Sequence, residues 1–166
     1  MKILHRVAVV AVACLAGMSV ASAQCEKPPK PVADYLKAHP GWRILTVGDL
    51  SKDQQMEWNE SHKAFCPGLA EAVLDATGEK SYALALVDKP ARQEEALILH
   101  GATPVMIYPA SPSVGIVTYR MPPGQYDEGG RKIAIAHDSV MYEFFESAAQ
   151  QFYFVNGKLR KLQAGD

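Results

Sequence analysis

The chain has 166 residues, of which 48% are hydrophobic, and its 17 basic and 18 acidic side chains give a formal net charge of −1. This length supports one domain with its own hydrophobic core and is too short for two domains that each have a sizeable core. The near-neutral charge gives the chain no electrostatic reason to bind nucleic acid or an anionic lipid surface.

Residues 1–23 have the pattern of a cleavable secretory signal peptide. A basic start precedes an apolar run from Val7 to Met18, and Ala21-Ser22-Ala23 supplies the small residues of a cleavage site. The run is shorter than the roughly 20 residues of a membrane span. We therefore predict export to the periplasm of a Gram-negative envelope, with residues 24–166 forming a single mature domain. The alternative is a lipoprotein acylated at Cys14.

Removal of the signal would change both the charge and the cysteine count. Lys2 and Arg6 would leave, so the basic residues would fall from 17 to 15 against 18 acidic residues, a net charge of about −3. Cys14 would leave as well. The remaining pair, Cys25 and Cys66, is predicted to form one disulfide in an oxidising compartment, with two free thiols as the alternative.

Two helices are predicted at the start of the mature chain. Val32, Tyr35 and Leu36 recur at helical spacing after Pro31, which suits a first helical turn, and His39-Pro40-Gly41 ends this helix. A short extended segment, Trp42 to Val47, follows. Ser51 and Gln54 then match a capping box that opens a second helix through about His62, on which Trp58 and His62 lie one turn apart.

The rest of the chain has the texture of short strands bounded by Pro, Gly, Asp or Ser. Asn156-Gly157 is a strong signal for a two-residue hairpin, because both turn positions require positive φ. Helices followed by strands predict an α+β domain, with two N-terminal helices packed on a mostly antiparallel sheet of about six to eight strands. The predicted strands are Leu69 to Leu74, Tyr82 to Val87, Ala96 to His100, Val105 to Tyr108, Val114 to Arg120, Lys132 to Ala136, Val140 to Phe145, Gln151 to Val155 and Lys158 to Leu162.

No motif for a metal or a cofactor is complete. The segment Asp75 to Ser81 has the outline of a calcium loop, but Thr77 and Ser81 stand where carboxylates are wanted and Lys80 adds an opposing charge, so a plain β-turn is the preferred interpretation. The mature histidines lack zinc-ligand spacing. Gly129-Gly130-Arg131-Lys132 lacks the spacing of a phosphate-binding loop. We therefore predict no metal and no cofactor.

The case for an enzyme rests on acidic residues. Neither Ser139 nor Ser147 lies in a G-x-S-x-G elbow, so we assign no catalytic residue. Strand alternation places Glu143 among apolar neighbours, where it is either paired with a base such as Arg120 or Arg131 or has a functional role. An envelope hydrolase using Glu143 and Glu146 is the alternative function that these acids suggest.

Aromatic residues crowd the C-terminal strands and cannot all face one core. The candidate binding residues are Tyr142, Glu143, Phe152 and Phe154, because an aromatic strand face bordered by charge is typical of a protein-binding patch. Ordinary cross-strand packing is the competing interpretation.

Several segments together resemble a family of small, secreted, functionally uncharacterised bacterial proteins. The resemblance covers most of the mature chain, implies an exported compartment and this architecture, and brings no catalytic residues. The segments are His39-Pro40-Gly41-Trp42, Asp49-Leu50 with Trp58, Cys66-Pro67-Gly68-Leu69-Ala70, Tyr82-Ala83-Leu84-Ala85-Leu86, Pro122-Pro123-Gly124-Gln125-Tyr126, and Tyr142-Glu143 with the Asn156-Gly157 hairpin.

The absence of a complete catalytic motif and the expected disulfide favour a binding protein. We predict a periplasmic inhibitor or immunity protein that neutralises an envelope-targeting toxin or hydrolase. Its partner would be a protein, with no nucleic acid and no stable membrane insertion after signal cleavage. A structural or stress-related envelope protein is a further alternative.

Overall fold

The computed structural model describes residues 25–112, 115–145 and 148–164, so the predicted signal peptide of residues 1–23 lies outside the described residues. Within these ranges the chain forms eleven strands in three sheets. Two α-helices, α2 (Lys30–Ala38) and α3 (Lys52–His62), lie wholly inside them, and no described helix is long and apolar enough to cross a membrane. The strands are β1 (Trp42–Ile44), β2 (Leu69–Val73), β3 (Lys80–Asp88), β4 (Gln93–His100), β5 (Thr103–Pro112), β6 (Ile116–Met121), β7 (Gly124–Glu128), β8 (Arg131–Ile135), β9 (Ser139–Phe144), β10 (Ala148–Val155) and β11 (Lys158–Ala164).

The first sheet is built around strand β3. Its order is β1-β3-β4-β5, and β2 also pairs with β3, on a different stretch of the strand from β1. All of these pairings are antiparallel. The second sheet has the order β11-β10-β9-β6, also antiparallel, and β7 and β8 form a separate hairpin. The chain therefore leaves the second sheet after β6 and returns to it at β9.

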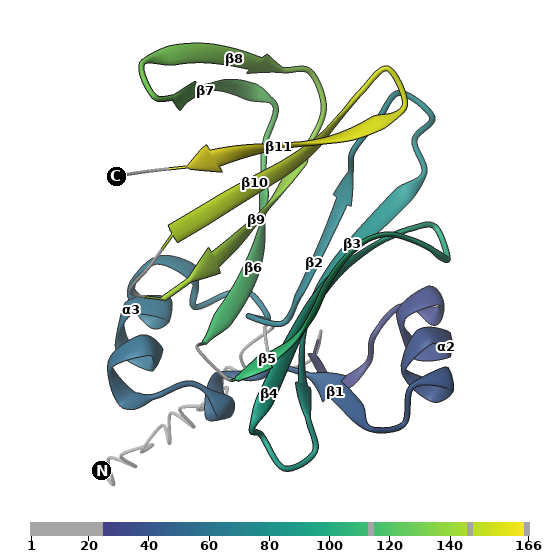
Figure 1. The fold of residues 1–166 in the computed structure, drawn as a ribbon, viewed down its shortest axis with the longest axis vertical. Coiled ribbons are helices and arrows are strands. Elements are labelled where there is room, and N and C mark those ends of the chain that lie inside the picture. Colours follow the sequence, from purple (N-terminus) through teal and green to yellow (C-terminus); the bar gives the residue numbers. More distant parts are fainter. Residues whose placement is uncertain (1–24, 113–114, 146–147, 165–166) are drawn as a thin grey trace, which may run out of the picture.

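The two larger sheets pack face to face around one core (Figure 1). The face of β3 toward the second sheet carries Ala83 and Ala85, which are fully or almost fully buried. Opposite these small residues lie the large rings of Tyr142 and Phe152. The Tyr142 hydroxyl donates to the Leu97 carbonyl at 2.5 Å and accepts from the Leu84 amide at 3.1 Å. The phenol is therefore satisfied inside the core, as a buried hydroxyl requires.

The opposite face of the first sheet is covered by helix α2. Leu84 and Leu86 of β3 face this side and belong to a second apolar cluster that includes Val32 of the helix. Strand β3 is thus buried on both faces, with helix on one and sheet on the other. The disulfide between Cys25 and Cys66 lies in the same cluster and joins the chain before α2 to the start of β2. This pairing confirms the predicted disulfide.

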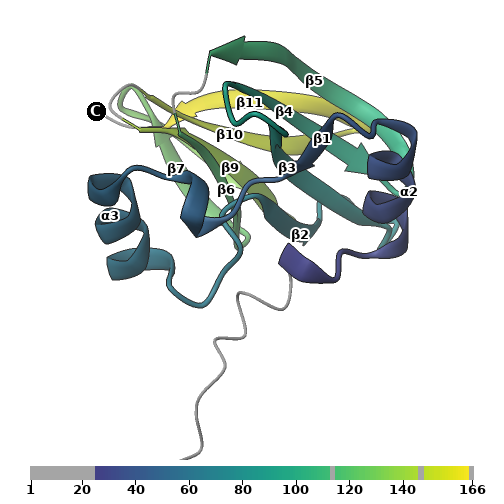
Figure 2. The ribbon, with the colours of Figure 1, turned by 90° about the horizontal axis from the view of Figure 1, so that it is seen from below.

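Helix α3 lies at the other end of the molecule from α2 (Figures 1 and 2). The predicted capping box is present: Ser51 Oγ accepts from the Gln54 amide at 3.3 Å and Gln54 Oε1 accepts from the Ser51 amide at 3.0 Å. A short 3₁₀ turn, Val47–Asp49, precedes it. The Asp49 carboxylate accepts hydrogen bonds from the two terminal nitrogens of the Arg43 guanidinium, at 2.6 and 2.5 Å, and from the Thr46 amide at 2.8 Å. These contacts fix the segment that leads into α3.

The outermost strands of the two sheets have different sequences. Strand β5 ends the first sheet and contains Pro104, Pro109 and Pro112, which offer no N–H group along that edge. Strand β11 ends the second sheet and carries basic residues, among them Lys158 and Arg160. Both are recognised devices against edge-to-edge pairing of strands.

The predicted fold class, two N-terminal helices packed on one sheet of six to eight strands, is wrong. The chain is a β-sandwich in which the C-terminal strands form a second sheet on the first. Both helices form where the sequence predicts them, yet they lie on different sheets. The Asn156-Gly157 hairpin is confirmed, with φ of 51° and 71° at the two turn residues. The physical reason for the error is that the aromatic strands cover the inner face of β3, which the prediction assigned to the helices.

Candidate binding surface at helix α3 and strand β6

Helix α3 presents Trp58 and His62 to strand β6. The two residues are four apart, so they lie on one helix face one turn from each other. The His62 ring stacks on the ring of Tyr119 with centroids 4.2 Å apart, and the Trp58 ring lies 6.4 Å from Tyr119. Burial lowers the pKa of His62, and the nearby charge of Glu143 only partly opposes this effect. The imidazole is therefore biased toward its neutral form.

Glu143 lies beside Tyr119 because β9 and β6 are paired. The register sets Glu143 opposite Val117 and Met141 opposite Tyr119, so these four residues share one face of the sheet. The Tyr119 hydroxyl donates to Glu143 Oε2 at 3.2 Å. Burial, then the Glu143 charge and this hydrogen bond, raise the pKa of Tyr119 well above its usual value. Tyr119 is thus held as a neutral donor that orients the carboxylate.

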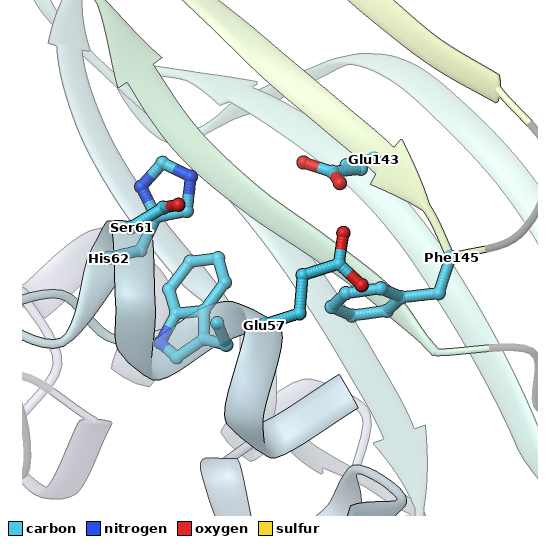
Figure 3. Close-up of a pocket in the computed structure, with 6 residues that line it drawn as sticks. Glu57, Ser61, His62, Glu143 and Phe145 are labelled. Carbon is cyan, nitrogen blue, oxygen red and sulfur yellow. The ribbon is translucent and has the colours of Figure 1, made fainter. Parts of the chain in front are cut away.

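A cavity of about 90 Å³, named here the acidic hollow, opens beside this carboxylate. In Figure 3 the carboxylates of Glu57, from α3, and Glu143, from β9, point toward one another across it. Neither carboxylate belongs to an ion pair in the described part of the chain. The residues that line the acidic hollow are Glu57, Trp58, Ser61, His62, Glu143 and Phe145.

The ion pair expected for Glu143 is not formed with either predicted base. The Arg120 guanidinium instead lies 3.6 Å from the Asp138 carboxylate, and no ion pair within the described ranges joins Arg131 to Glu143. Glu146, the second acid of the hydrolase alternative, lies outside the described residues. Glu143 therefore faces Glu57 across the hollow, without an ion pair to either arginine in the described ranges.

The aromatic candidates do not share one exposed patch. Tyr142 is fully buried and Phe152 is 4% exposed, both in the core between the sheets. Phe154 is half-buried at the edge of that core, with its ring 5.2 Å from the His100 ring. Of the four predicted binding residues, only Glu143 lines the acidic hollow. The helical spacing places Trp58 and His62 one turn apart, but nothing in the sequence connects them to Tyr119.

The segment considered for calcium is a turn stabilised from within. The Asp75 carboxylate accepts from the Thr77 amide at 3.0 Å, and a second contact joins it to the Thr77 hydroxyl. No group of three His, Cys, Asp or Glu side chains in the described ranges is arranged to hold a metal ion.

A serine, a histidine and a carboxylate meet next to this turn. Ser81 Oγ lies 2.8 Å from His100 Nδ1, and His100 Nε2 lies 3.2 Å from Glu79 Oε2. These are the residue types of a hydrolytic triad. Ser81, however, is completely buried, so its oxygen has no route to a substrate carbonyl. The group is therefore a structural hydrogen-bond network that joins β3 to β4.

Comparison with known proteins gives no family for the chain. No protein-family model matches it, and no curated protein or solved structure matches it significantly. The resemblance to small secreted bacterial proteins therefore stays a prediction, and the candidate function has to be argued from the surface itself.

Proposed function

We propose that the protein binds another protein in the bacterial periplasm, as an inhibitor or immunity protein that neutralises an envelope-targeting toxin or hydrolase. The acidic hollow would receive a lysine or arginine side chain of that partner. The observation that carries the proposal is the pair of carboxylates, Glu57 and Glu143, that face each other across the hollow without a basic partner among the described residues. Two negative charges that face one cavity favour a cation between them.

The remaining lining suits the same occupant. Trp58 and Phe145 place aromatic rings at the hollow, and such rings attract ammonium and guanidinium groups. The lowered pKa of His62 keeps a competing positive charge out of the site near neutral pH. The hydrogen bond from Tyr119 holds Glu143 in place before the partner arrives, which reduces the entropy lost on binding.

The size of the hollow argues against a glycosidase that uses Glu57 and Glu143. A glycosidase needs two carboxylates on either side of a bound sugar, and a cavity of about 90 Å³ holds only a few water molecules or the end of one side chain. A single basic side chain from a protein partner fits this volume.

A direct test titrates the protein with N-acetyl-arginine amide and N-acetyl-lysine amide, with N-acetyl-glutamine amide as the neutral control. We expect the cationic probes to bind with dissociation constants of about 1 mM and to shift the indole N–H resonance of Trp58. Glu57→Gln and Glu143→Gln should each weaken this binding about tenfold or more, since each removes a charged acceptor. Equal binding of the neutral amide would contradict the proposal.

Glu60 offers a matched control, because it is exposed on the same helix and does not line the hollow. Glu60→Gln should leave probe binding unchanged. The protein-level test compares captures from periplasmic extract by the unaltered protein, by Glu60→Gln and by the double variant Glu57→Gln/Glu143→Gln. A partner should be retained by the first two and lost by the third. Recovery of nothing above background, or equal recovery by all three, would refute the proposed role.

A further inference from the structure

A second and larger hollow lies where the two sheets meet along one side of the sandwich. Strands β2 and β6 run side by side there (Figures 1 and 2), and the Thr118 amide donates to the Pro67 carbonyl at 2.8 Å. The hollow, named here the seam groove, has a volume of about 500 Å³. Small-molecule sites commonly have about 300–1,000 Å³. Its lining consists of Lys27, Pro29, Phe65, Leu69, Ala70, Glu71, Thr118, Tyr119, Arg120 and Pro122.

We infer that the seam groove binds a small amphiphile with one anionic group, of the class of medium-chain carboxylic acids. The inference is independent of the proposed protein partner, because the groove differs from the acidic hollow in size and in the sign of its charges. Among the described residues the two have no lining residue in common, and the link between them is Tyr119, which lines the groove and donates its hydroxyl hydrogen bond to Glu143 of the acidic hollow.

Apolar and aromatic side chains, among them Phe65, Leu69 and Pro122, line much of the groove. Phe65 is 52% exposed and presents its aromatic ring at the groove, where a hydrocarbon chain could cover it. The Thr118 hydroxyl donates to the Met141 carbonyl at 2.8 Å, and the Tyr119 hydroxyl donates to Glu143. Both hydroxyl groups are therefore already hydrogen-bonded elsewhere. This part of the groove suits the hydrocarbon chain of the ligand.

The charges at the groove favour an anion. Glu71 is already paired with Lys80 at 2.6 Å, so its charge is balanced from outside the groove. The Arg120 side chain is 58% exposed and contacts Asp138 through one guanidinium nitrogen at 3.6 Å, which leaves further N–H groups able to bind a carboxylate. Lys27 belongs to no ion pair in the described ranges. The groove is thus lined by two cationic side chains, Lys27 and Arg120, that could attract the carboxylate of a ligand.

The wall that carries Lys27 is held in position before any ligand binds. Lys27 lies two residues after Cys25, whose disulfide to Cys66 anchors this segment beside the start of β2. Pro28 and Pro29 follow and restrict the backbone further. A wall that is fixed in advance loses less conformational freedom on binding. This is why we assign the groove to a free, monomeric ligand and not to a membrane surface.

The test is calorimetric titration of the purified protein with decanoate below its micelle concentration, beside decanol and decyltrimethylammonium. Decanoate should bind more tightly than decanol, and the cation should bind least. Lys27→Gln/Arg120→Gln should remove the preference for decanoate over decanol, a loss of about tenfold. Phe65→Ala should weaken decanoate and decanol alike.

Two control variants show whether decanoate binding depends on the seam groove alone. Met56→Ala removes an apolar side chain that is 61% exposed but does not line the groove, and it should change nothing. Glu57→Gln/Glu143→Gln should also leave decanoate binding intact, so failure of the protein-binding proposal would not affect this result. The inference is overturned if decanoate does not bind, or if the charge variants bind it as the unaltered protein does.

Discussion

The contacts of Asp49 predict how the stability of the protein depends on pH. The hydrogen bonds from Arg43, followed by those from the Thr46 amide and hydroxyl, lower the pKa of Asp49 to about 2 from an ordinary value of 3.8, against an opposing effect of burial. A difference of nearly two pKa units corresponds to about 2 kcal/mol of stability. The side chain of Asp49 is only 12% exposed, so solvent screening reduces this figure little.

The sign of the dependence follows from the direction of the shift. Because the pKa of Asp49 is lower in the folded state, its contribution is complete above about pH 4 and is lost as the pH falls toward 2. Asp49→Asn should therefore lower the free energy of unfolding by about 2 kcal/mol at pH 7. The difference between the variant and the unaltered protein should shrink steadily between pH 4 and pH 2.

Urea unfolding, followed by tryptophan fluorescence at several pH values from 7 to 2, measures this difference directly. Asp34→Asn is the control, since Asp34 forms a surface pair with Lys30 and its side chain is 59% exposed. The control should cost about 0.5 kcal/mol or less. If Asp49→Asn is as destabilising at pH 2 as at pH 7, the ionised carboxylate is not the source of the stability and the reasoning is refuted.

Three further substitutions test the core, the disulfide and the hairpin. Tyr142→Phe should cost about 1–3 kcal/mol in urea unfolding, because the Leu97 carbonyl loses its buried donor, and an unchanged midpoint would mean that water replaces the hydroxyl. The Cys25→Ser/Cys66→Ser variant should be about 4 kcal/mol less stable, because the disulfide closes a loop with a sequence separation of 41. Equal stability of the unaltered protein with and without reductant would contradict this. Gly157→Ala should cost about 1 kcal/mol at its φ of 71°, measured as a lower melting temperature, and a higher melting temperature would argue against left-handed strain.

Local features of the fold could be predicted from the sequence because their signals are local. The capping box at Ser51 and the hairpin at Asn156 depend on a few neighbouring residues, and both are present. Strand β7 escapes prediction because Gly124–Glu128 is mostly exposed and shows no apolar alternation. The division into two sheets depends on pairings such as β6 with β9, which skip a whole hairpin and leave no trace in either strand alone.

The candidate site shows the same limit. Strand alternation identifies Glu143 as an acid among apolar residues, and in the structure it accepts the Tyr119 hydroxyl and lines the acidic hollow. Its neighbours Tyr119 and His62 come from a different strand and from a helix, both far from it along the chain. Only the tertiary packing of α3 on the second sheet brings these groups together. A prediction from local pattern could therefore name one member of the site and not its partners.

The two edges of the sandwich should respond differently to dissolved salt. Prolines on β5 hinder the addition of a further strand because they have no backbone N–H group, and salt concentration does not change this. The basic residues on β11 act through charge repulsion, and at 1 M salt such repulsion extends only about 3 Å. Concentrated salt would thus remove the protection of one edge alone. Any filaments or dimers formed under those conditions would grow from β11, and its backbone amides would be the ones newly protected from hydrogen exchange.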